Sequence, residues 1–137
     1  ATLYAGSATV QTSDERIKEN IEAVALGLEF INKLNPVQFE HRQPADYDAS
    51  LKENLNWHKL GKDPRVLEED QKSKLRVGFI AQDVGAVLQE LGFDSNNNIV
   101  DIDKNTTQQA IAYAHMIAPL VKAVQELTER VKELEDK

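Results

Sequence analysis

The chain has 137 residues, which is enough for one domain with a modest core. Apolar residues make up 41% and charged residues 28%, and the formal net charge of -7 argues against a nucleic-acid surface. The absence of cysteine excludes disulfides, a thiolate nucleophile and a zinc–thiolate centre, and no run of about 18 apolar residues is present to cross a membrane. We therefore expect neither a nucleic acid nor a membrane as a partner.

Residues 1–12 carry no charge and are rich in small and β-favouring residues. A weak alternation of period two over residues 8–11 predicts an extended segment or a strand. The chain begins without methionine and in the middle of this pattern, so we interpret it as a piece of a longer protein.

A helical pattern follows over residues 13–35. Apolar residues recur at spacings of three and four, which predicts a stripe that is buried in the core. The stripe consists of Ile17, Ile21, Val24, Leu28 and Ile31, with Leu34 after it. Ser13 stands at the N-cap position, ahead of acidic residues that suit the helix dipole. Gly27 allows two shorter helices instead of one, and Asn35-Pro36 ends the segment.

The same segment places a lysine five residues after a serine, at Ser13 and Lys18. A serine beside a lysine amine is the minimal pair of nucleophile and base for acyl chemistry. A capped and solvated helix start has the same spacing, and the two residues by themselves favour that interpretation.

The middle of the chain predicts two strands, a helix and a long charged segment. Residues 37–42 alternate as a half-buried strand does, and His41 in it has no second ligand at metal-binding spacing. Residues 75–80 predict another strand, followed by a helix over about 81–91 with Gly92 as its C-cap. At the corner between them, Gln82 either supports the serine or makes a buried backbone bond, and the second interpretation is favoured.

Residues 43–74 are charged, with scattered apolar residues, and predict short helices around residues 51–55 and 66–72. Trp57 and His58 are candidates for an exposed partner contact, although a small cluster under a loop is the favoured interpretation. Residues 94–98 lack the glycine and glutamate of a calcium loop, so we predict a turn and then a strand over 98–102. We expect no metal and no cofactor.

The C-terminal part predicts a helix over about residues 106–136. Thr106 and Gln109 fit a capping box, and Pro119 predicts a kink or a fresh start near Ala118. Beyond it a heptad seam is formed by Ile117, Leu120, Val124, Leu127, Val131 and Leu134. Arg130 and Glu135 fall at positions g and e, where they can pair between helices. We favour a self-association seam over a helix that packs inside its own domain.

Four motifs in one order carry a resemblance to a known family. They are S-D-E-R-I-K-E-N-I from Ser13, L-N-P-V-Q-F from Leu34, G-F-I-A-Q-D-V from Gly78, and the apolar helix from Ile117 to Leu127. Together they resemble the C-terminal intramolecular chaperone domain of phage tail spikes, tail fibres and neck appendages, the peptidase S74 domain.

The resemblance implies an α+β fold: a helical domain with a few short strands, a long charged insertion over about 43–74, and a trimeric coiled-coil helix at the C-terminus. Residues 1–12 would be the end of the upstream fibre segment, and residues 13–137 the chaperone domain. The implied partners are two further copies, as a homotrimer, and the upstream fibre or appendage domain of the same chain.

The resemblance also implies a single-turnover autoproteolytic serine peptidase. The domain would register the fibre during folding in the host cytoplasm and then cut the Thr12–Ser13 bond, with release from the mature virion. Ser13 would be the nucleophile and Lys18 the general base, with Asp14, Arg16 and Gln82 as possible support. Lysine is a poor base at its free pKa of about 10.4, and Arg16 is one local cation able to lower it. The alternative is a non-catalytic trimeric cap or adaptor in which Ser13 serves as an N-cap.

Overall fold

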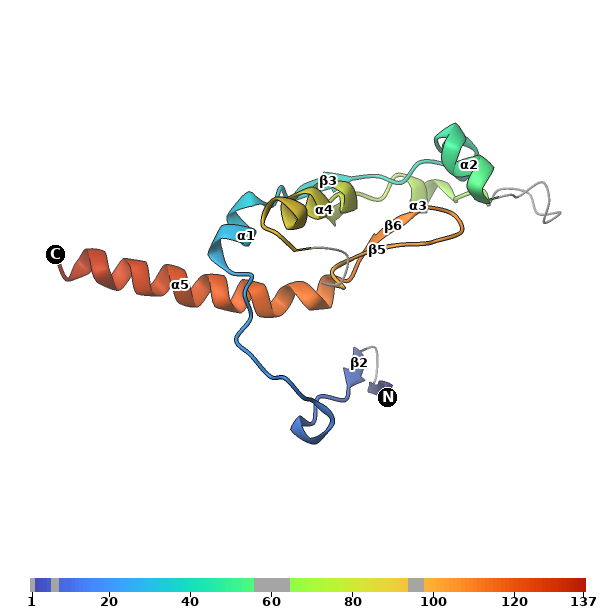
Figure 1. The fold of residues 1–137 in the computed structure, drawn as a ribbon. Helices are drawn as coiled ribbons and strands as arrows, with labels where there is room; N and C mark the ends of the chain where they lie inside the picture. Colours follow the sequence, from blue (N-terminus) through green and yellow to red (C-terminus); the bar gives the residue numbers. More distant parts are fainter. Residues whose placement is uncertain (1, 6–7, 56–64, 94–97) are drawn as a thin grey trace.

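The computed structural model describes residues 2–5, 8–55, 65–93 and 98–137, drawn in Figure 1. The helices are α1 (Leu28–Lys33), α2 (Ala49–Leu55), α3 (Glu69–Lys72), α4 (Ala81–Glu90) and α5 (Ile117–Glu135). The strands are β1 (Thr2–Ala5), β2 (Ala8–Gln11), β3 (Val37–Phe39), β4 (Arg76–Gly78), β5 (Val100–Ile102) and β6 (Gln109–Ile111). Short 3-10 turns lie at Glu15–Ile17, Pro44–Asp46 and Tyr113–Met116. The predicted α+β class is confirmed.

The strands form three separate antiparallel pairs: β1 with β2, β3 with β4, and β5 with β6. The pair β1–β2 is a hairpin within residues 2–11, so the extended segment predicted there is confirmed. The pair β3–β4 joins positions far apart in the sequence, with Val37 opposite Gly78 and Phe39 opposite Arg76. This pairing brings the two ends of the segment 40–75 side by side.

The core lies where α1, α4 and the chain around β5 and the start of α5 meet. Its most deeply buried side chains are Phe30, Val84 and Leu88. Leu26, Ile99 and Met116 complete the buried cluster. The helical spacing of Val84 and Leu88 places both on one face of α4, and each is 1% exposed. A small core of this kind leaves much apolar surface elsewhere on the chain uncovered.

The segment between β3 and β4 holds the two short helices α2 and α3. The helix predicted at residues 51–55 is confirmed by α2, and the one predicted at 66–72 is confirmed over its second half by α3. The Gln43 amide anchors this segment by donating to the Leu67 carbonyl (3.0 Å) and accepting from the Leu67 N–H (2.8 Å). Trp57 and His58 lie outside the described residues.

The continuous helix predicted over residues 13–35 is wrong. A 3-10 turn at Glu15–Ile17 and helix α1 are the helical parts of this segment, and residues 18–27 run between them without regular structure. Ile17 and Ile21 are 68% and 67% exposed, so the amino-terminal half of the predicted stripe is not core. Gly27 is the N-cap of α1, which agrees with the division expected at this glycine.

The helix predicted to begin at Thr106 is also wrong. Residues 109–111 form β6, paired with β5, and the loop between the strands is closed by Asp103, whose carboxylate accepts from the Asn105 N–H (2.8 Å). Thr107 has a φ of 62°, which no helix contains. Helix α5 therefore begins at Ile117, which places Pro119 in its first turn and confirms the fresh start expected there.

The rest of the sequence pattern agrees with the structure more closely. Helix α4 confirms the predicted helix, and Gly92 follows it with a φ of 86°, a conformation that favours glycine. Strands β3, β4 and β5 confirm three predicted strands, each shorter than expected. None of the helices in the described parts of the chain is long and apolar enough to cross a membrane.

Candidate functional site

The 3-10 turn at Glu15–Ile17 brings together the serine and the lysine singled out in the sequence. The Lys18 backbone N–H donates to the Glu15 carbonyl (3.0 Å), and the Ile17 N–H donates to the Asp14 carbonyl (3.2 Å). These bonds reverse the chain within four residues. As a result, the Lys18 amine donates a hydrogen bond to Ser13 Oγ across 2.6 Å. A serine hydroxyl and a lysine amine in direct contact have the geometry required of a nucleophile and its base.

A second contact, between Asp14 and Arg16, holds this turn. The Asp14 carboxylate accepts from the Arg16 backbone N–H (2.9 Å) and from the guanidinium Nε (3.1 Å) and Nη2 (2.8 Å). The side-chain bond with Arg16 lowers the pKa of Asp14, and the same bond raises the pKa of Arg16. Asp14 therefore engages the Arg16 guanidinium within this turn, and the role of Arg16 as a cation beside the lysine stays a prediction.

Ser13 does not serve as the helix N-cap that the sequence predicts. Asp14 is the N-cap, and the turn that it caps is three residues long. A turn of this length provides neither the dipole nor the row of free N–H groups that a long helix would offer to an oxyanion. Residues 13–18 therefore offer an oxyanion no support from the N-terminus of a long helix.

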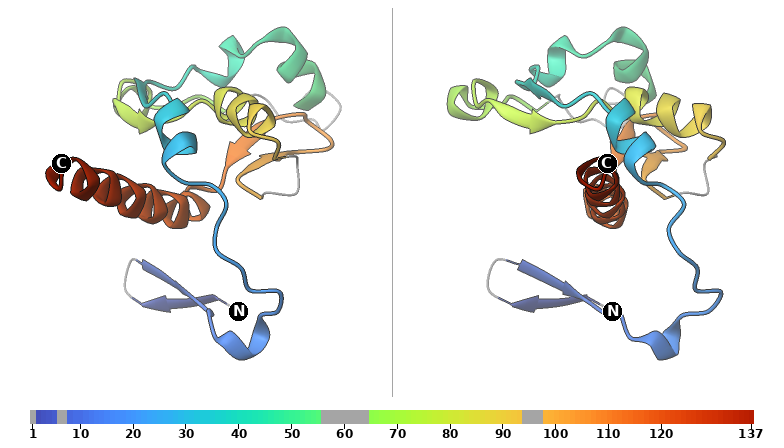
Figure 2. Two further views of the ribbon diagram at one scale, coloured as in Figure 1. Left: turned by 60° about the vertical axis from the view of Figure 1, so that its left-hand side comes forward. Right: turned by 90° about the vertical axis from the view of Figure 1, so that its left-hand side faces the viewer.

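The serine and lysine lie on an extended arm, residues 8–23, that stands apart from the body of the domain (Figures 1 and 2). Residues 10–23 are exposed except for the half-buried Asp14. Gln82 is exposed on the first turn of α4, which lies in the body, so the single chain does not bring it to the arm. Its exposure disagrees with the buried backbone bond considered for Gln82, whereas the supporting role stays a prediction.

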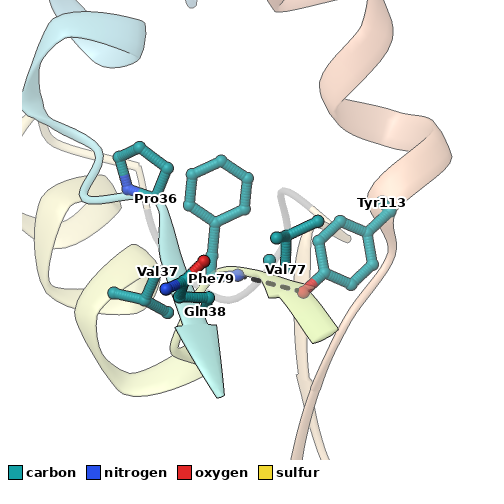
Figure 3. A pocket seen from close by; sticks show the side chains of 7 residues that line it. Pro36, Val37, Gln38, Val77, Phe79 and Tyr113 are labelled. Atoms are coloured by element: carbon teal, nitrogen blue, oxygen red, sulfur yellow. Dashed lines mark hydrogen bonds between the residues drawn. The ribbon is translucent and has the colours of Figure 1, made fainter. Parts of the chain in front are cut away.

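An apolar groove of about 610 Å³ lies beside the β3–β4 pair, as Figure 3 shows. It is lined by Pro36, Val37, Gln38, Val77, Gly78, Phe79 and Tyr113. The Phe79 N–H donates to the Tyr113 hydroxyl (3.2 Å), and a methyl group at Gly78 would come within 2.6 Å of that hydroxyl. The polar side chains among its lining residues are those of Gln38 and Tyr113. Sequence analysis missed Tyr113, although the glycine at position 78 signals a close approach.

Helix α5 has two faces with different surroundings. Its buried residues are Pro119 and Ala123. The helix packs against α1 (Figure 2). The heptad stripe is formed by Ile117, Leu120, Val124, Leu127, Val131 and Leu134, and these side chains are 44–68% exposed. The interpretation of this stripe as a face that packs inside its own domain is therefore wrong. Within the chain described, the stripe is available to another molecule.

The comparison with known families decides what kind of domain this is. The family model Peptidase S74, described as the chaperone of endosialidase, matches residues 13–93, more than half of the chain. The chain belongs to this family. The matched residues of the S74 chaperone domain contain three of the four motifs noted in the sequence, and the match begins at Ser13. None of the curated proteins compared with the chain matches it.

Membership gives this S74 domain a chaperone role and the name of a peptidase family. Helix α5 lies beyond the matched residues, so the C-terminal motif rests on its sequence alone. Among the described residues, no group of three or more histidine, aspartate and glutamate side chains could hold a metal ion.

Proposed function

We propose that this domain is an intramolecular chaperone that cuts itself off at the Thr12–Ser13 bond, with Ser13 as nucleophile and Lys18 as general base. The observation that carries the proposal is the 2.6 Å contact between the Lys18 amine and Ser13 Oγ. The family match supports it because it begins at Ser13. Strand β2 ends at Gln11, so the β-rich upstream structure stops one residue before the proposed bond.

The reaction consumes one water molecule and forms one covalent intermediate. The neutral Lys18 amine takes the Ser13 hydroxyl proton as Oγ attacks the carbonyl carbon of Thr12. The bond from that carbon to the Ser13 nitrogen breaks, and the lysine returns its proton to the departing nitrogen. Water then hydrolyses the ester between Thr12 and Ser13 Oγ. The products are a Thr12 carboxylate and a chain that begins at Ser13 with a free amine.

The exposure of this pair in the single chain favours a reaction that waits for assembly. A lysine amine in open water keeps its proton at neutral pH, and a drier environment favours the neutral form that can act as a base. The partners that could cover the arm are further copies of this chain, joined through the exposed α5 stripe. The reaction would then follow correct assembly and would not precede it.

We propose a homotrimer, in keeping with the family resemblance. Isoleucine or valine at position a with leucine at d would favour two strands in a free parallel coiled coil, so the stripe by itself does not specify three. The body of the domain, which packs on α5 through Pro119 and Ala123, would set the number of copies. The assembled domain would register three chains of a phage fibre or appendage in the host cytoplasm, and cleavage would release it from the virion.

A non-catalytic trimeric cap is the second candidate, and one observation favours it. The hydrogen bond between the Lys18 amine and Ser13 Oγ joins two exposed residues across a turn, and a purely structural role for the two residues would give the same contact. To separate the two, a chain extended upstream of Ala1 is incubated as assembled protein, beside its Ser13→Ala variant, and the products are resolved on a denaturing gel. Self-cleavage predicts two fragments from the wild type and one intact chain from the variant. An intact wild type would support the cap.

A further inference from the structure

Helix α5 contacts the root of the arm as well as the core. Lys122 and Glu126, one helical turn apart, both reach the segment where the arm joins the body. The Lys122 amine donates to the Val24 carbonyl, and Glu126 Oε1 accepts from the Leu28 N–H (3.3 Å). Both side chains are partly buried. The Glu126 carboxylate thus satisfies one of the free N–H groups at the start of α1, where no side chain of its own segment does so.

Gly27 permits this close approach. It is buried between the two α5 side chains, and a methyl group there would overlap Glu126 Oε1 and lie 3.2 Å from Lys122 Cδ. The contact therefore depends on three residues from two distant parts of the chain. We call Gly27, Lys122 and Glu126 the arm clamp.

The clamp lies on a different face of α5 from the heptad stripe. With Ile117 at position a, Lys122 falls at f and Glu126 at c, whereas the stripe occupies a and d. A single rigid helix thus presents the stripe on one face and holds the root of the arm with another. On the arm side of the clamp, residues 19–23 are exposed and lack regular structure. The clamp therefore fixes the point and direction in which the arm leaves the body.

We propose that Lys122 and Glu126 are positioning residues for self-cleavage. They fix the point where the arm leaves the body relative to α5. Copies joined through the stripe therefore present every Ser13–Lys18 pair to the same surroundings. This inference rests on the proposed self-cleavage. A domain without the clamp still folds around its core and assembles through the stripe. Its arm, however, leaves the body in variable directions, so the Ser13–Lys18 pair is covered by the neighbouring copies less often.

The test compares three variants of the upstream-extended chain, each as assembled protein. Glu126→Ala removes the acceptor, Glu126→Gln keeps an oxygen that can accept from the Leu28 N–H, and Glu133→Ala is the control, one heptad later and exposed. The first-order cleavage rate is measured beside the mass of the assembly. Glu126→Ala should cut at least about tenfold more slowly at unchanged mass, because misplaced reacting groups lose rate steeply. Glu126→Gln and the control should cut at the wild-type rate.

Gly27→Ala tests the same contact from its other side. Its methyl group displaces the Glu126 carboxylate, so this variant should slow cleavage as Glu126→Ala does. The double variant should be no slower than either single one, because both remove one contact. Cleavage of Glu126→Ala at the wild-type rate, or equal loss in Glu126→Gln, would overturn the inference while self-cleavage stands. If Glu126→Ala does not assemble, Gly27→Ala decides on the same criterion. An uncut wild type would instead remove the proposed function and the inference together.

Discussion

The Lys18 amine lies 2.6 Å from Ser13 Oγ, across a turn that Asp14 and Arg16 hold closed. This distance lies within the hydrogen-bond reach that a nucleophile and its general base require. Both residues are exposed within the single chain. The contact between Ser13 and Lys18 is thus formed within one chain, whereas the proposed covering of this pair would come from assembly. The pair, the turn and the stripe can therefore be tested separately.

Replacement of the lysine tests its role as a base. Arginine keeps the positive charge and can donate to Ser13 Oγ, but it does not release its proton at accessible pH. Lys18→Arg should therefore fold and assemble normally and leave the chain whole, as measured by denaturing gel and by sedimentation. Normal cleavage by this variant would reduce Lys18 to a structural contact.

Replacement of Asp14 tests the turn. Asp14→Ala removes every bond that the carboxylate makes with Arg16, so the turn opens and Lys18 loses its approach to Ser13. Cleavage should slow by about tenfold or more, because the reacting groups are no longer held together. Global stability should change little, since residues 14 and 16 are remote from the core. Glu15→Ala, next in the chain, is the matched control, and an equal loss of rate there would contradict this role.

The acid dependence of the turn follows from the direction of the Asp14 pKa. Arg16 holds the pKa of Asp14 below its usual range, so the contact contributes fully above that range and is lost as the pH falls through the lowered value. Nuclear magnetic resonance of the Arg16 side chain should report the loss only at strongly acidic pH. A transition near neutral pH would show that another group controls the turn.

A charge placed on the stripe tests the link between assembly and cleavage. Leu127→Asp would gather carboxylates near the axis of the assembly, where each must be protonated or left unpaired. This variant should be an uncut monomer by sedimentation equilibrium and gel. Gln125→Asp, which adds the same charge off the stripe, should assemble and cut. A monomeric wild type would contradict the trimer, and a monomeric Leu127→Asp that still cuts would contradict the coupling.

Salt should strengthen assembly. A trimer carries three times the net charge of one chain, -21 in place of -7, and this repulsion is screened as ionic strength rises. Sedimentation equilibrium at low and moderate salt should therefore give a tighter trimer at moderate salt. Weaker association with added salt would show that attraction between charges, and not burial of the stripe, holds the copies together.

The parts of the fold that follow local patterns could be predicted from the sequence. The spacing of Val84 and Leu88 predicts α4, and the alternation around Val37 predicts β3. Strand β6 could not be predicted, because Gln109 and Ile111 pair with β5, and the residues around position 110 show no strand pattern of their own. Ile17 and Ile21 have helical spacing, but the small core does not reach them, so their segment leaves the body as an arm.

The candidate site was predicted in part. The spacing of Ser13 and Lys18 alone favoured a capped helix start, and the family resemblance indicated them as a pair. The structure places the two side chains in contact by a 3-10 turn in place of the expected helix cap. The heptad spacing predicted the exposed stripe of α5. Lys122 and Glu126 gave no such signal, because charges at positions f and c usually face water. Their partners, the Val24 carbonyl and the Leu28 N–H, lie almost a hundred residues away, and such backbone groups carry no sequence signature.

The most direct test of self-cleavage is the intact mass and N-terminal residue of the C-terminal product. Wild-type chain extended upstream of Ala1 is purified, incubated as assembled protein and weighed by mass spectrometry, with Ser13→Ala treated in parallel. Self-cleavage predicts a fragment with the mass of residues 13–137 and a free amino group on Ser13, and no fragment from the variant. A single uncut mass from the wild type, or the same fragment from Ser13→Ala, would contradict it.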